Sequence, residues 1–152
     1  MANQFLDKRL SVHRNDSAGT DFLSTTPLLI GDIGLQTGAA VPTGNAANVR
    51  VALTGTVGIL NDVAVVDDIL LTVERNGNGT AGTGVVILTE AFNTNGAPIA
   101  APFSITAGDF PPAAAVIAGE IRYSLFISAT GTGTVPLRGP VVFNGSASAG
   151  TT

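Results

Sequence analysis

The feature that most constrains the fold is a series of short apolar runs from about residue 23 onward, each closed by Gly, Pro, Asn or Thr. Within the runs apolar and polar residues alternate, as where Ile121, Tyr123 and Leu125 occupy every second position. Period two is the pattern of a half-buried strand, and no segment shows three turns of amphipathic helix. Roughly seven or eight such strands, separated by turn residues, predict an all-β chain folded as a single antiparallel β-sandwich of the jelly-roll kind.

Clusters of Gly, Asn and Pro mark the expected turns. The Gly-dense stretch 76–84 lies between two expected strands and predicts a hairpin loop. It lacks the Lys-Ser/Thr ending of a phosphate-binding loop, and a strand rather than a helix follows it. We also expect turns at 31–34 and at Asn-Gly pairs such as 144–145, and a single helical turn at 113–118.

The N-terminal segment differs from the rest of the chain. We predict a connector arm at residues 1–18 and the jelly-roll domain at 19–152. In the arm, apolar residues alternate with polar ones, which is typical of an extended segment that completes the open sheet edge of a neighbouring subunit. The expected subunit-interface residues are Phe5, Leu6, Leu10, Val12 and His13. Such a head-to-tail contact builds a fibre when it does not close into a ring.

The charge content limits the classes of partner. Charged residues make up 12% of the chain, about half the usual ~25%, so the surface must consist largely of small neutral residues that suit packing against identical copies. The net charge of −4 speaks against nucleic acid, because the basic cluster Lys8, Arg9 and Arg14 is too small for a binding face. No apolar run is long enough to span a membrane. The absence of cysteine excludes disulfides and thiolate chemistry.

No group of residues in the sequence indicates a reaction. His13 is the only histidine and lies on the arm, where an interface role is more plausible than catalysis. The acidic residues Asp62, Asp67, Asp68 and Glu74 lack the spacing of an EF-hand calcium loop. One tyrosine and no tryptophan leave no aromatic platform for sugars. We therefore expect no enzyme activity, no cofactor and no metal.

Four segments carry a resemblance to a known group: VRVALTGTVGI, DDILLTVERNGNGT, GEIRYSLFISATGTG and VPLRGPVVFNGSAS. Between about residues 48 and 143 the chain resembles the jelly-roll proteins of bacterial endospore surfaces, which include exosporium proteins with a tumour-necrosis-factor-like sandwich and subunits of pilus-like appendages. The N-terminal arm resembles the connector by which an appendage subunit inserts into the next one. Several appendage subunits carry cross-linking cysteines, and this chain has none.

This resemblance implies a self-assembling subunit of a fibre at the spore surface, with other spore-surface proteins as further partners. Synthesis inside the mother cell would agree with an N-terminus that has no apolar core of a secretory signal peptide. Two other assemblies remain open from the sequence. One is a closed trimeric head of the tumour-necrosis-factor type, and the other is a capsid or decoration jelly roll of a virus or phage.

Overall fold

Nine β-strands, one short α-helix and two 3₁₀ turns make up the computed structural model, which describes residues 3–19, 21–61, 67–95, 99–131 and 135–150. The strands are β1 (Gln4–Arg14), β2 (Asp21–Phe22), β3 (Leu28–Gln36), β4 (Val49–Asn61), β5 (Asp67–Arg75), β6 (Val85–Asn93), β7 (Ile99–Asp109), β8 (Glu120–Gly131) and β9 (Pro136–Ala149). The helical pieces are η1 (Gly38–Ala40), η2 (Ala46–Asn48) and α1 (Ala113–Ile117).

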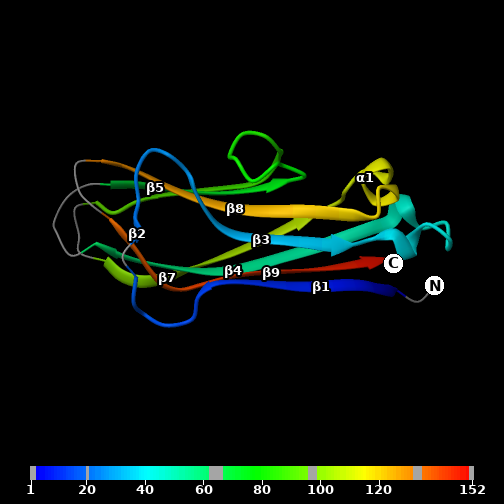
Figure 1. Ribbon diagram of the computed structural model, residues 1–152, viewed down its shortest axis with the longest axis horizontal. Helices are drawn as coiled ribbons and strands as arrows, with labels where there is room; N and C mark the ends of the chain where they lie inside the picture. Colours follow the sequence, from blue (N-terminus) through cyan, green and yellow to red (C-terminus); the bar gives the residue numbers. More distant parts are fainter. Residues whose placement is uncertain (1–2, 20, 62–66, 96–98, 132–134, 151–152) are drawn as a thin grey trace.

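Two antiparallel sheets lie face to face, and α1 sits at the same end of the sandwich as both chain termini (Figure 1). The first sheet, called the β1 sheet, has the order β1-β9-β4-β7, and the short β2 also pairs with β9. The second, called the β3 sheet, has the order β3-β8-β5-β6. Apart from the β5-β6 hairpin, strands that neighbour each other in space are far apart in the sequence, as in a Greek-key sandwich. The predicted all-β jelly-roll fold is therefore confirmed.

The core lies between the two sheets and follows from the alternation seen in the sequence. Along β5, Ile69, Leu71 and Val73 are all 0% exposed, while residues of the opposite face alternate with them. Tyr123 and Phe143 are the largest fully buried side chains among the described residues. Burying each such apolar side chain stabilises the fold by roughly 1.5–3 kcal/mol, so this shared core holds the sheets together.

The N-terminal segment is an edge strand of its own sandwich. β1 pairs antiparallel with β9, from Gln4 opposite Ala149 to Arg14 opposite Val141. The structure thus corrects the predicted division into an arm at 1–18 and a sandwich at 19–152. The strand prediction for this segment is confirmed, but its partner is the chain's own last strand. An edge strand is half-solvated and keeps many polar residues, which is why the segment looks like a separate tail in the sequence.

Two expected turns are instead continuous strand. Residues 31–34 lie within β3, and 144–145 lie within β9. A Cβ atom at Gly31 would come within 2.6 Å of the Cβ of Phe143, and one at Gly145 within 2.7 Å of Leu53 and 2.8 Å of Ile33. Both glycines therefore make room for large side chains in the core, a use of glycine that the local sequence does not distinguish from a turn.

The hairpin prediction for 76–84 and the helical turn near 113–118 are confirmed. β5 and β6 pair antiparallel on either side of the Gly-rich loop. Glu74 is only 2% exposed, and its carboxylate accepts hydrogen bonds from the backbone N–H groups of Gly82 (2.6 Å) and Gly84 (2.9 Å). Asn76 has a φ of 56°, a left-handed conformation that asparagine tolerates in tight turns. The carboxylate of Glu74 thus shapes the loop.

A polar cluster links the sheets inside the sandwich. The Arg75 side chain on β5 donates to both carboxylate oxygens of Asp109 on β7, at 2.8 and 2.7 Å. The Tyr123 hydroxyl on β8 donates to the same carboxylate at 2.7 Å. Burial, followed by the interaction with Asp109, raises the pKa of Tyr123 far above its ordinary value. The three groups satisfy one another, so the cluster is a cross-link between the sheets.

Candidate assembly surface

The outward side of the β1 sheet is a charge-poor surface that extends over four strands, and it is called the outer β1 face below. β1 places Phe5, Lys8, Leu10 and Val12 on it, because these residues lie opposite outward positions of β9. The side chains of Phe5, Leu10 and Val12 are 67%, 63% and 45% exposed. These three apolar side chains thus line one edge of the face in contact with solvent.

The remaining strands contribute small, mostly neutral residues to the face. They are Val142, Asn144, Ser146 and Ser148 of β9, Arg50, Ala52, Thr54 and Thr56 of β4, and Ser104, Thr106 and Gly108 of β7. One row across the sheet runs from Leu10 through Asn144 and Thr54 to Thr106. The Thr54 hydroxyl donates to Asn144 Oδ1 at 3.0 Å within this row. Apart from Arg50, the small side chains on these three neighbouring strands leave a low-relief surface that another protein can approach closely.

Charge on the outer β1 face has one sign. Lys8, Arg50 and Arg138 lie at outward positions, and no carboxylate of the described residues does. Arg50 donates to the backbone oxygen of Gly150 at 2.9 Å, and its guanidinium lies 5.9 Å from the centre of the Phe110 ring. Phe110 is 75% exposed and extends the apolar character to the β7 side. The face is therefore weakly basic with exposed aromatic and aliphatic side chains at both margins.

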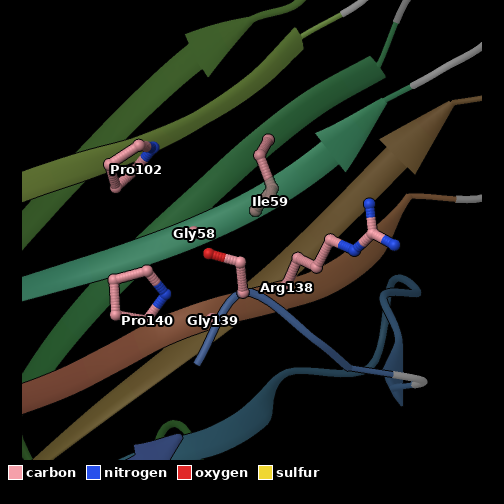
Figure 2. A pocket seen from close by; sticks show the side chains of 7 residues that line it. Gly58, Ile59, Pro102, Arg138, Gly139 and Pro140 are labelled. Carbon is pink, nitrogen blue, oxygen red and sulfur yellow. The ribbon is translucent and has the colours of Figure 1, made fainter. Parts of the chain in front are cut away.

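A shallow hollow of about 250 Å³ opens on the same sheet where β4, β7 and β9 run together. Figure 2 shows Pro102 and Pro140 on either side of Gly58, with Arg138 beside them. Ser17, from the connection that follows β1, completes part of the wall. The lining is mostly apolar with a single cation, so the hollow suits an apolar side chain from a partner better than a reaction.

β1 is held to the rest of the sandwich by more than its pairing with β9. The Asp7 carboxylate accepts from the backbone N–H of Gln36 at 2.9 Å, and the Ser11 hydroxyl accepts from that of Asp32 at 3.1 Å. Both donors belong to the open edge of β3, so β1 joins the two sheets and covers edge groups that could otherwise pair with another chain. Leu6 packs against the core.

The pKa of Asp7 reflects these contacts. Burial raises it, but hydrogen bonds from the Gln36 backbone, the Arg9 side chain and the Lys8 backbone outweigh that effect and hold the pKa below its ordinary value of 3.8. The ionised carboxylate is therefore the form that fastens β1 to β3.

The structure separates the five residues predicted for the subunit interface. Phe5, Leu10 and Val12 lie together on the outer β1 face and remain available to a partner. Leu6 faces the core of its own subunit. His13 Nε2 lies 3.1 Å from Asp21 Oδ2, so this side chain links β1 to β2 within the same chain.

The five residues predicted for the subunit interface do not include Arg50 and Arg138. Alternation along β4 and β9 places both on outward positions, so the signal was present in the sequence. That the two arginines share one face with Lys8 follows only from the order β1-β9-β4 in the sheet.

The acidic cluster of the sequence does not form one group in the described part of the chain. The Glu74 carboxylate accepts hydrogen bonds from the hairpin loop, and Asp68 accepts one from the Asn93 side chain at 2.6 Å. Asp62 lies outside the described residues. Across the described residues no set of three His, Asp or Glu side chains gathers as a metal site. Among the same residues, no helix is long and apolar enough to cross a membrane.

Comparison with known proteins identifies the fold but no family. No family description matches the sequence, and no curated protein matches it either. Among solved structures, the VP2 protein of infectious bursal disease virus, in T=1 particles of a D431N mutant, shares 11% identity at a TM-score of 0.51 over 94% of this chain and 35% of that one. Eiger TNF from S. frugiperda shares 15% identity at a TM-score of 0.46 over 94% of this chain and 92% of that one. The chain thus spans about a third of the length of the viral protein.

Proposed function

We propose that this chain is a structural subunit that associates with copies of itself, and that it does so through the outer β1 face while each copy keeps its own N-terminal strand. The observation that carries this proposal is the outer β1 face itself. It spans four strands, has no carboxylate among its described residues, and exposes Phe5, Leu10 and Val12 along one strand. Soluble monomers rarely leave such apolar groups together in water, and a face of this kind is typical of a protein interface.

The low charge of the whole chain supports the same proposal. Only 12% of the residues are charged, where a free domain usually carries about 25%. A monomer depends on surface charge to stay soluble and separate from its copies. A subunit that spends its life packed in an assembly has less need of that charge.

Of the three assemblies predicted from the sequence, the closed trimer and the shell are better supported than the fibre joined by N-terminal strands. Strand addition would require β1 to leave β9 and to give up the hydrogen bonds of Asp7 and Ser11 with β3. A solved protein with the same fold forms T=1 particles, which gives a precedent for a jelly roll as a building block. The spore surface remains a proposed location that rests on the sequence resemblance alone.

The mass of the purified protein in solution tests this function. Light scattering after gel filtration, over a wide range of concentration, should give a mass above that of the 15.2 kDa chain, rising with concentration. Negative-stain electron microscopy of the same fractions then distinguishes rings, shells and filaments. A single-chain mass at every concentration would overturn the proposal.

A further inference from the structure

We propose that self-association is front to back: the outer β1 face of one copy docks on the outward side of the β3 sheet of the next copy. This inference rests on the proposed self-association and specifies which surfaces meet. It follows from the opposite charge of the two broad faces of the sandwich.

The outward side of the β3 sheet, called the outer β3 face, is acidic. Its described residues include four carboxylates, on Asp32, Asp68, Glu74 and Glu120, and one guanidinium, on Arg122. Outward placement follows from the register, since each of these residues alternates with fully buried neighbours such as Ile69, Val73 and Ile121. Among its described residues the outer β1 face, in contrast, carries three charged groups, all of them cations: Lys8, Arg50 and Arg138.

Two of the four carboxylates have no cationic partner among the described residues. Arg122 donates to both oxygens of Asp32, and the Glu74 carboxylate is buried against the hairpin loop. Asp68 and Glu120 are exposed, and the side-chain groups that bind them are neutral amides, at 2.6 Å from Asn93 and 2.5 Å from Gln36. A bond to a neutral amide leaves the negative charge uncompensated.

The charges also disfavour the symmetric alternatives. Two copies that met through their outer β1 faces would bring Lys8, Arg50 and Arg138 of one copy toward the same cations of the other. Contact between two outer β3 faces would oppose Asp68 and Glu120 in the same way. Like charges placed opposite each other weaken an interface, whereas the front-to-back arrangement pairs opposite charges.

Apolar contacts and area are available for such docking. The outer β3 face exposes Leu70 (38%) and Val86 (54%), which can meet the exposed Phe5 and Leu10 of the other face. Four strands about 4.8 Å apart, with ~10 residues each at ~3.3 Å per residue, give a face of roughly 600 Å² in projection. A standard interface buries about 800 Å² of accessible surface on each partner, so one face is of the right size.

A contact between two different faces is heterologous, so it leaves one unused face at each end of any open chain of copies. Such a contact closes into a ring when the rotation between neighbours allows it, and otherwise extends into a filament. Front-to-back docking therefore yields an assembly larger than a dimer.

Charge reversal tests the pairing of faces. The first variant, Lys8→Glu with Arg138→Glu, makes the outer β1 face acidic; the second, Asp68→Lys with Glu120→Lys, makes the outer β3 face basic. We expect each variant alone to require at least an approximately hundredfold higher concentration for assembly than the wild type. An equimolar mixture should assemble again, because each face then meets an oppositely charged one.

A control variant, Ala47→Glu with Ala114→Glu, adds acidic groups at exposed positions on η2 and on α1, which pack against each other at the end of the sandwich. It should assemble like the wild type, and circular dichroism should show that every variant is folded. Front-to-back docking would be overturned if the mixture failed to assemble, or if either variant alone assembled normally. Assembly of the wild type would still support the proposed function in that case. A wild type that stays a monomer would remove both.

Discussion

At the scale of single residues, a buried polar cluster links the two sheets of this fold. It consists of Arg75, Asp109 and Tyr123. The side chains of Arg75 and Asp109 are only 12% and 8% exposed, and their ion pair joins β5 to β7 across the sandwich. Alternation in the sequence places Arg75 and Tyr123 on the inward faces of their strands. It does not indicate that Asp109, 34 residues beyond Arg75, supplies the partner, because that pairing depends on how the two sheets are stacked.

Substituting Arg75→Met should lower the free energy of unfolding by about 3–5 kcal/mol, because it leaves Asp109 buried without its cation. Denaturant unfolding followed by circular dichroism measures the change. The matched control is Arg9→Met, which removes a 51% exposed partner of Asp7 and should cost at most about 1 kcal/mol. Similar losses for the two variants would contradict the role given to the buried pair.

The raised pKa of Tyr123 predicts a loss of stability at high pH. Above pH 10.0, the ordinary pKa of tyrosine, the unfolded chain releases the phenolic proton while the folded chain retains it. Ionisation therefore stabilises the unfolded state, and the free energy of unfolding falls as the pH rises. In Tyr123→Phe this component disappears, at a cost of about 1 kcal/mol at neutral pH for the lost hydrogen bond. The free energy of unfolding should therefore change less between neutral and strongly alkaline pH in the variant than in the wild type. An equal change in both proteins would contradict a raised pKa of Tyr123.

β1 is the element for which the sequence prediction and the structure differ most: the sequence predicts a connector arm for a neighbouring subunit, and the structure has an edge strand of the same sandwich. Alternation of Leu10 and Val12 with polar residues correctly predicts a strand, but its partner could not be predicted. The strand pairs with β9, where Gln4 lies opposite Ala149, and local propensity holds no information on a contact between the two ends of a chain. The turns predicted at 31–34 and 144–145 failed for a related reason, since their glycines serve contacts with residues distant in sequence.

Deleting residues 1–14 should destabilise the whole sandwich. The truncation exposes the edge of β9, removes Leu6 from the core and leaves the N–H groups of Asp32 and Gln36 without their partners on β1. We expect a lower melting temperature by circular dichroism and increased aggregation. Deletion of residues 1–3 leaves β1 intact and serves as the control. A stable, soluble monomer from the longer deletion would instead support a dispensable connector arm.

At the scale of the whole molecule, the two broad faces of the sandwich carry charges of opposite sign. The sequence provides the net charge of −4 and the low charged content, but it does not divide the charges between two faces. That division depends on the strand orders β1-β9-β4-β7 and β3-β8-β5-β6, which bring Lys8, Arg50 and Arg138 to one side and Asp68 and Glu120 to the other.

Ion pairs at the rim of an interface weaken with salt, so assembly should weaken as the ionic strength is raised.

An internal disulfide between β1 and β9 tests most directly whether subunits keep their own N-terminal strand when they assemble. Gln4 and Ala149 are register partners on the inward side of the β1 sheet, and the chain has no other cysteine to compete with Gln4→Cys and Ala149→Cys. Cross-strand partners have Cα atoms about 4.5–5.5 Å apart, within the range that a disulfide spans. We predict that the oxidised protein, with β1 locked in place, assembles to the same mass as the reduced protein. Oxidised protein that remains a single chain and assembles only after reduction would show that copies exchange their first strands, and would contradict the account.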